Sequence, residues 1–277
     1  VHGYEKITST RPRMEMRARA LPEARLTTSR LRTALVDRDY QEIITYSFVD
    51  PDLQKLLDPA TRPLALANPI AANMSVMRTS LWPGLLQTLL YNQNRQAERQ
   101  RLFEVGRRFL SAAGHISQDC MIAGVITGPT GTPQWGMERR EVDFFDAKAD
   151  VEALLALTGK AGEYRFQPAD QPALHPGMAA EILFQGNHIG WVGGLHPGIG
   201  EKLNLDRPVF LFELTCTVFE EARVPIYREI SRFPAIRRDL AVTVEASLPA
   251  AEILKCVKNV AGNLLVNLEL FDEYRGK

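Results

Sequence analysis

The chain has 277 residues, of which 45% are hydrophobic and 24% charged, and its 33 basic side chains balance 33 acidic ones. This composition is that of a globular protein with one large domain and a smaller piece. It excludes the overall positive field that draws a whole domain to nucleic acid, so any RNA contact must come from a local patch.

Targeting and redox signals are weak. No segment approaches the roughly 18 apolar residues of a membrane span, and the arginine-rich start has no signal-peptide core. Cys120, Cys216 and Cys256 are far apart and lack metal-ligand spacing, so we expect reduced cysteines, no metal site and a cytoplasmic location. The chain does not begin with Met, and we interpret it as a piece of a longer protein.

The N-terminal part predicts a linker followed by a helix and a strand. Residues 1–25 read as the tail of an upstream domain and an arginine-rich connector, which is either solvated or faces RNA. Residues 27–38 predict a helix capped by Ser29, with Leu31 and Leu35 on its apolar stripe. Alternation over residues 44–48 predicts a half-buried strand.

The next segment predicts two helices and a short strand. Asp50-Pro51 opens a helix that runs to Leu57, and residues 62–66 are compatible with a strand. Pro83 fits the first turn of another helix, because its missing N–H costs nothing there. The apolar stripe of that helix consists of Leu85, Leu86, Leu89 and Leu90.

The middle of the chain predicts strands around a polar connector. Strands are expected over residues 102–109 and 121–127, with a connector over 111–118 between them. Asp146 is the expected cap of the helix that follows, and an Asp143–Asp146 pair of catalytic carboxylates is the less favoured interpretation. Its buried face is expected to hold Val151, Leu154, Leu155 and Thr158.

Two Leu-His-Pro-Gly repeats flank a predicted hairpin over residues 180–195 that turns at Gly186-Asn187, and another strand is expected over 209–214. A metal site of His175, His188 and His196 is discounted, because no carboxylate or cysteine stands at ligand spacing. Beyond a connector, a strand over 240–244, a helix over 249–260 and a strand over 264–274 predict half of a ferredoxin-like unit.

Two long motifs, NPIAANMSVMRTSLWPGLL at residues 68–86 and RLFEVGRRF at 101–109, resemble the β subunit of bacterial phenylalanine–tRNA ligase. The resemblance implies an α+β fold, with an antiparallel class II synthetase-like sheet flanked by helices over residues 26–216. It further implies a linker over 217–229 and the start of a ferredoxin-like anticodon-binding domain over 230–277.

The resemblance also implies a domain without catalytic residues. Active class II enzymes use an arginine to clamp the substrate phosphate, and Leu110 stands at the matching position. The Glu-Arg of the third class II motif is missing from residues 191–197. We therefore interpret Leu110, His175 and His196 as the rim of a relic cleft.

The implied partners are a catalytic α subunit in an α2β2 assembly and tRNA(Phe), with ATP and Mg2+ on α and no cofactor on this chain. The candidate subunit-interface residues are Leu31, Leu35, Arg78, Trp82 and Leu86. The candidate tRNA-binding residues, which combine charge with aromatic faces, are Arg232, Phe233, Arg237, Arg238 and Tyr274.

Two alternatives stay open. The first is a self-contained amino-acid-activating enzyme, in which Arg107 or Arg108 replaces the missing clamp. The second is a stand-alone RNA-binding module, which the balanced net charge disfavours.

Overall fold

The computed structural model describes residues 3–11, 14, 24–112, 114–136, 138–227, 229 and 232–274. It divides into two compact units, Val1–Pro225 and Ile226–Lys277. Most of the predicted linker before residue 26 lies outside the described residues.

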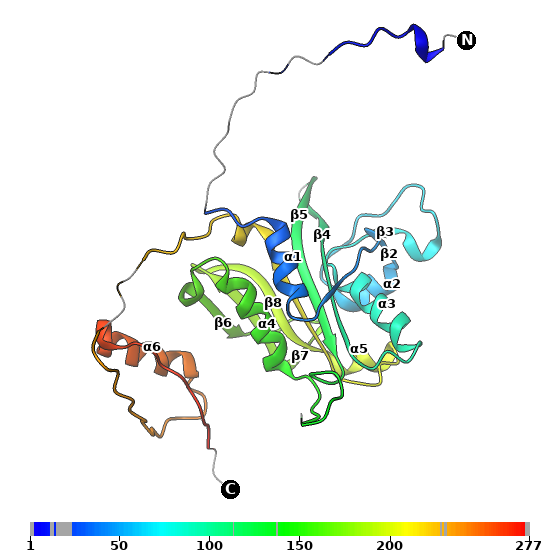
Figure 1. The fold of residues 1–277 in the computed structure, drawn as a ribbon. Helices are drawn as coiled ribbons and strands as arrows, with labels where there is room; N and C mark the ends of the chain where they lie inside the picture. Colours follow the sequence, from blue (N-terminus) through cyan, green and yellow to red (C-terminus); the bar gives the residue numbers. More distant parts are fainter. Residues whose placement is uncertain are drawn as a thin grey trace. The chain divides into compact units, whose positions relative to one another are not determined.

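A seven-stranded sheet forms the centre of the first unit, in the order β1-β4-β5-β9-β8-β7-β6 (Figure 1). Every neighbouring pair is antiparallel except β1 and β4. The strands are β1 (Gln41–Glu42), β4 (Gln100–Ala112), β5 (His115–Thr127), β6 (Tyr164–Pro168), β7 (Leu174–Phe184), β8 (Asn187–Leu195) and β9 (Val209–Thr215). A second, two-stranded sheet pairs β2 (Phe48–Val49) with β3 (Val76–Met77).

Helices cover both faces of the large sheet (Figure 1). One apolar cluster contains residues of α1 (Thr28–Val36) and α4 (Phe144–Ala156), and the other contains residues of α2 (Pro51–Leu57), α3 (Trp82–Gln93) and α5 (Pro197–Lys202). The alternation of side chains along β5 explains why the buried residues divide into two clusters, since successive side chains point to opposite faces of the sheet. Ile122 and Ile126 join the first cluster, whereas Ala123 and Val125 join the second.

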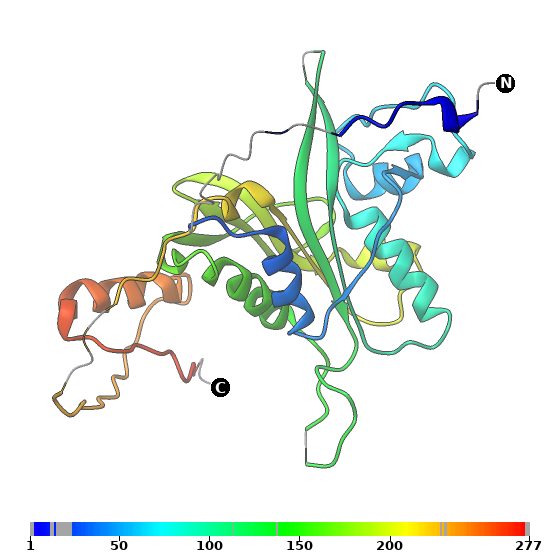
Figure 2. The same cartoon turned by 45° about the horizontal axis from the view of Figure 1, so that its top comes forward.

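Strands β4 and β5 continue beyond their neighbours as a two-stranded ribbon (Figure 2). Their pairing runs from Gln100–Thr127 to Ala112–His115, but β9 pairs only with residues 121–127 of β5. The predicted connector over 111–118 is therefore wrong. Its polar residues suggested a loop, but both faces of a projecting ribbon contact water while the ladder satisfies the backbone.

The caps and the first strand also differ from the predictions. Thr27, not Ser29, caps α1 by accepting from the backbone N–H of Arg30. Asp143 caps α4, while Asp146 supplies the reciprocal bond of a capping box. The strand expected over 44–48 is reduced to Phe48–Val49 of β2.

Several local predictions are confirmed. Helix α2 follows Asp50 and helix α3 contains Pro83 in its first turn. The hairpin between β7 and β8 forms, although its turn residues are Gln185 and Gly186, both with positive φ. The expected strand over 62–66 is wrong, because only an isolated bridge from Ala65 to Val76 forms there.

The second unit contains α6 (Ala250–Ala261) and the 3-10 helix η5 (Gly262–Leu264). The strands expected over 240–244 and 264–274 are wrong, since the described residues of this unit contain no strand. Its described residues also contain no buried side chain, so they provide no hydrophobic face against which a small sheet could become stable. Among the helices of the described residues, none combines the length and apolar character that a membrane crossing requires.

Candidate functional site

The sheet face beneath α3 carries the position expected to hold a phosphate clamp. Side chains alternate along β4, so Glu104, Gly106, Arg108 and Leu110 share one face. Glu104 pairs across the sheet with Ala123, which belongs to the apolar cluster of α3. Leu110 is half-buried and lies on the projecting ribbon, opposite Ser117.

His175 and His196 lie at the opposite end of the sheet from Leu110. Leu174 pairs with Leu195, and the register across β8, β9 and β5 aligns this end with the start of β4. At about 3.3 Å per residue, Leu110 is about 30 Å farther along β4. The three residues therefore do not rim one cleft.

Each of these histidines accepts a local hydrogen bond from a backbone N–H two residues later. His175 Nδ1 accepts a hydrogen bond from the Gly177 backbone N–H at 2.9 Å. His196 Nδ1 accepts from the Gly198 N–H at 3.1 Å and caps α5. The predicted turn role is confirmed at His196, whereas the first repeat runs within β7.

A buried ion pair occupies the face that Leu110 shares. Arg78 Nη1 lies 2.8 Å from Glu104 Oε1, and both side chains are almost fully buried. The Arg78 Nε–H donates to the carbonyl of Arg107 at 2.9 Å. Thr45 Oγ1 accepts from Arg78 at 3.0 Å and donates to Glu104 Oε2 at 2.7 Å. The guanidinium is thus bound from three sides within the chain.

Gly106 makes room for this guanidinium. A Cβ at Gly106 would lie 2.3 Å from Arg78 Nη2 and 3.0 Å from Glu104 Oε1. The first of these contacts is shorter than atoms tolerate, so a side chain at this position would displace the Arg78 guanidinium. The glycine of the RLFEVGRRF motif therefore serves the packing of Arg78.

A second carboxylate is buried on the same side of the sheet. Glu213, on β9 opposite Ala123, accepts a hydrogen bond from the Leu81 backbone N–H at 2.7 Å. Burial raises the pKa of Glu213 to about 7, and this hydrogen bond together with the charges of Arg108 and Arg78 opposes the shift. The contact fixes the start of α3 against the centre of the sheet.

Helix α2 holds the same segment from the other side. Gln54 Nε2 donates to Thr79 Oγ1, and this hydroxyl donates to Asp58 Oδ2, both at 2.6 Å. The Thr79 N–H in turn donates to Gln54 Oε1 at 3.2 Å. Residues 78–81 are therefore pinned by side chains of α2, β4 and β9.

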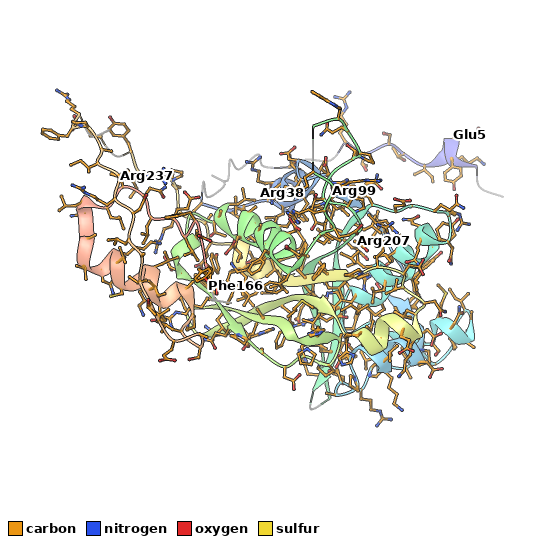
Figure 3. The ribbon with its side chains drawn as sticks, turned by 90° about the horizontal axis from the view of Figure 1, so that it is seen from below. Glu5, Arg38, Arg99, Phe166, Arg207 and Arg237 are labelled. Carbon is orange, nitrogen blue, oxygen red and sulfur yellow. The ribbon has the colours of Figure 1, made fainter. Side chains whose placement is uncertain are left out.

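The opposite sheet face has its own buried charge. Asp150 of α4 accepts from Arg38 at 2.6 Å, from Arg101 at 2.9 Å and from the Tyr40 hydroxyl at 2.7 Å. Burial and the Asp150 carboxylate raise the pKa of Tyr40 well above its ordinary value, so this hydroxyl remains a donor. Arg99, which Figure 3 labels, pairs with Asp39 at 3.2 Å. This network ties α1 and α4 to the sheet.

The two arginines of the alternative enzyme hypothesis are also engaged. Arg108 Nε lies 3.1 Å from Asp119 Oδ2, its cross-strand partner. Arg107 is exposed and donates to Gln118 at 3.4 Å. Neither reproduces the position of Leu110. Arg107, three places away on the strand, points to the other face, and Arg108, which shares the face of Leu110, is bound by a carboxylate.

The arginines of this arrangement do not fit a clamp for nucleotide phosphates. A guanidinium that clamps a nucleotide phosphate must direct free donors toward it. Arg78 and Arg108 both direct donors at carboxylates, and Leu110 has none. Among the described residues, no three His, Cys, Asp or Glu side chains gather as a metal cluster.

The predicted subunit-interface residues are buried inside the chain. Leu31 and Leu35 pack in the cluster of α1 and α4, whereas Trp82 and Leu86 pack in the cluster of α3. Arg78 is bound to Glu104. A partner could reach these side chains only after the core had opened.

The predicted tRNA-binding residues all belong to the second unit and are exposed. Arg232 lies 3.4 Å from Glu229, and Arg237, which Figure 3 labels, lies 3.3 Å from Asp239. Such exposed pairs contribute little to stability, so the guanidiniums can exchange partners.

Sequence reasoning missed the carboxylates that fill the site. Glu104 stands between Phe103 and Val105, and Glu213 stands between Phe212 and Leu214. A single carboxylate inside an apolar strand is a signal of a buried pair, because an unpaired charge in a core is costly. That signal could have identified both residues, although not their partners.

A comparison with protein families matches residues 7–216 to the phenylalanyl tRNA synthetase beta chain CLM domain. The chain belongs to the phenylalanyl-tRNA synthetase β-chain family. Residues 231–277 match the ferredoxin-fold anticodon binding domain. The resemblance inferred from the two sequence motifs is thus confirmed, and so is the ferredoxin-like identity of the second unit.

Similar curated proteins are β subunits of phenylalanine–tRNA ligase. Those of Nitrosococcus oceani, Hahella chejuensis and Pseudomonas syringae pv. tomato are 46%, 47% and 45% identical over the full chain. The chain spans 35% of the length of each of these relatives.

Among solved structures, a pyrrolysyl tRNA synthetase from Desulfitobacterium hafniense is similar, with a TM-score of 0.50. Its identity is 14%, and the match covers 68% of this chain and 62% of that one. This likeness concerns the fold alone. The helix-flanked sheet is a class II synthetase-like α+β fold, as expected from the resemblance.

Proposed function

We propose that the chain is a non-catalytic scaffold within the β subunit of phenylalanine–tRNA ligase. It pairs with a catalytic α subunit in an α2β2 assembly in the cytoplasm and helps to position tRNA(Phe) for ATP-dependent aminoacylation. ATP and Mg2+ bind to α. The observation that carries the proposal is the Arg78–Glu104 pair, which fills the face expected to bind nucleotide.

The Arg78–Glu104 pair also orients residues that could form a contact surface for the α subunit. Thr45 points inward to Arg78 and Glu104, so the alternating neighbours Ile44 and Tyr46 point outward. Ile44 is 93% exposed and Tyr46 is 65% exposed. Gly84 leaves room for the inward-pointing Thr45 side chain, since a Cβ at Gly84 would lie 2.2 Å from Thr45 Oγ1.

The segment also lies at an edge. It leaves β1, which pairs with β4 at the end of the sheet, and Ile43 still donates to the Phe103 carbonyl at 2.8 Å. Exposed apolar side chains beside a sheet edge favour association with another chain. We therefore assign the α-subunit contact to residues 43–47 in place of the buried candidates.

The tRNA contact is assigned to the second unit. Its exposed arginines and the exposed aromatic rings of Phe233 and Tyr274 combine a positive charge with stacking surfaces. The balanced net charge of the chain fits a local patch better than a stand-alone RNA-binding module.

Pyrophosphate exchange with phenylalanine and ATP tests the scaffold role. The chain alone should show no exchange, whereas the chain purified with a co-expressed α subunit should be active. Arg107→Ala and Arg108→Ala should leave the exchange rate of the complex unchanged. Turnover by the chain alone, with its loss in either variant, would establish the self-contained enzyme instead.

Co-purification with the α subunit tests the assigned surface. The double variant Ile44→Asp, Tyr46→Asp should lower recovery of the complex by about tenfold or more, because buried aromatic anchors dominate interfaces. Trp135→Asp is the matched control, since Trp135 is fully exposed on the loop after β5. Equal losses in both variants would refute the assignment to residues 43–47.

Filter binding of tRNA(Phe) to the complex tests the RNA contact. Arg237→Ala should weaken binding and reduce the slope of log affinity against log salt by about one. An unchanged slope in this variant and in Arg232→Ala would remove the second unit from the tRNA interface.

A further inference from the structure

Two of the three cysteines meet at the surface of the first unit. The Sγ atoms of Cys120 and Cys216 lie 2.8 Å apart, although the residues are far apart in the chain. Cys120 is exposed on β5, and Cys216 is half-buried at the start of η4 (Cys216–Phe219). The third cysteine, Cys256, is exposed on α6 in the other unit.

The sheet register explains this meeting. Met121 of β5 pairs with Thr215 of β9, and antiparallel pairing places the next residues, Cys120 and Cys216, opposite each other. Opposite residues in antiparallel strands have Cα atoms about 4.5–5.5 Å apart and side chains on one face. This separation falls within the range of about 4.4–6.8 Å that disulfides require.

Cys216 begins a segment whose later residues contact residues 24–26, and we call this contact the junction. Phe219, at the end of η4, accepts a hydrogen bond from the Leu26 N–H at 3.3 Å. The Ala222 N–H donates to the Ala24 carbonyl at 2.7 Å. A bond between Cys120 and Cys216 would therefore fasten this junction to the central sheet.

We propose that Cys120 and Cys216 form a reversible disulfide that secures the junction of residues 24–26 and 216–223. The oxidant is a small disulfide such as oxidised glutathione. The Cys120 thiolate, which is the accessible sulfur, attacks it, forming a mixed disulfide and releasing one glutathione thiolate. The Cys216 thiol then loses its proton and attacks the Cys120 sulfur, releasing the second glutathione. Two protein thiols are oxidised, and one glutathione disulfide is reduced to two thiols.

The surroundings assign these two roles. Burial raises the pKa of the Cys216 thiol well above its ordinary value, so it is a poor first nucleophile. Once the mixed disulfide has formed, Cys216 is the sulfur beside it, and proximity compensates for its small thiolate fraction.

Peptide mapping after equilibration with oxidised glutathione tests the proposal, on this chain and on its complex with α. We expect a Cys120–Cys216 linked peptide that dithiothreitol removes. Alkylation of both thiols should fall by about tenfold or more. Cys256 should carry at most a glutathione adduct. The link should persist in Cys256→Ser and be lost in Cys120→Ser, whose exposed position tolerates the change.

Other outcomes would overturn the site. Separate glutathione adducts on Cys120 and Cys216, or links between two chains, would show that the two sulfurs do not join. Hydrogen exchange of the oxidised wild type provides a second readout. Amides of residues 24–26 and 216–223 should exchange more slowly than in Cys120→Ser, and equal rates would refute the fastening of the junction.

Discussion

The two faces of the central sheet each bury ionised side chains, but they satisfy them differently. Beneath α1 and α4, Asp150 receives two arginines and a hydroxyl. Beneath α3, Arg78 and Glu104 neutralise each other, whereas Glu213 has a backbone N–H at 2.7 Å and a pKa raised to about 7. Helices are tied to both faces, but the charged groups of the first face share one carboxylate, whereas those of the second face form an ion pair and a separate carboxylate.

This difference agrees with the scaffold role proposed for the synthetase-like sheet. A cleft that loses its phosphate clamp must still fill its volume, since voids and unpaired charges destabilise a core. Arg78 fills it, and Gly106 leaves the space that it needs. The inward ion pair then orients the exposed residues 43–47 through Thr45.

The largest effect is expected from Arg78→Ala. Removing one partner leaves Glu104 buried and uncompensated, so the free energy of unfolding should fall by about 3–5 kcal/mol. Urea denaturation of the chain measures this change. Arg62→Ala, at an exposed position, is the control and should change stability by less than about 0.5 kcal/mol.

A paired replacement sharpens this test. Arg78→Met together with Glu104→Met should recover most of the loss, because an apolar pair carries no desolvation cost. If the double variant were as unstable as Arg78→Ala, packing rather than charge would explain the effect.

Asp150→Ala tests the other face. Arg101 is 10% exposed at its side chain and would lose its partner, whereas Arg38, at 38%, can turn to water. We expect a loss of about 3 kcal/mol in the free energy of unfolding, measured in the same way. Asp206→Asn, at an exposed position, is the control. A loss below that of Asp206→Asn would refute a stabilising network.

The sequence predicts the elements of this sheet better than its charged contacts. Local signals identify α2, α3, β8 and β9: a proline opens α2, an apolar stripe marks α3, a hairpin turn precedes β8, and an apolar run marks β9. The partners of Glu104 and Asp150 cannot be found in this way, since Thr45, Arg78 and Arg38 come from distant segments.

The failures have physical causes too. The polar segment 111–118 suggested a loop, yet residues 111–112 and 115–118 belong to strands, because a ribbon needs no apolar face to satisfy its backbone. The strands expected beside α6 have the right composition but no paired neighbours among the described residues of that unit. Strand formation depends on such neighbours more than on propensity.

Glu213→Gln tests whether the buried carboxylate of the face beneath α3 makes the free energy of unfolding depend on pH. The folded pKa of about 7 lies above the ordinary value of 4.5, so the folded chain binds more protons between these values. Stability is therefore fully present below pH 4.5 and declines as pH rises through about 7. The variant should lack this decline and gain about 2–3 kcal/mol at pH 8 relative to wild type.

Urea denaturation from pH 4.5 to 8 measures this dependence. Glu201→Gln, exposed on α5, is the matched control and should retain the decline of the wild type. A decline that persists in Glu213→Gln would assign it to another group.

Asp143→Ala gives the smallest expected effect and asks whether local capping or the buried network holds α4. The Asp143 carboxylate accepts from the N–H groups of Phe145 and Asp146, and its loss should cost about 1 kcal/mol. Asp146→Ala is the comparison variant, because the Asp146 carboxylate accepts a hydrogen bond from the Asp143 N–H and forms an ion pair with Arg140. Combined with Asp150→Ala in a double-mutant cycle, Asp143→Ala should be additive if capping is independent of the network. A coupling above about 1 kcal/mol would show that the cap and Asp150 hold the helix as one unit.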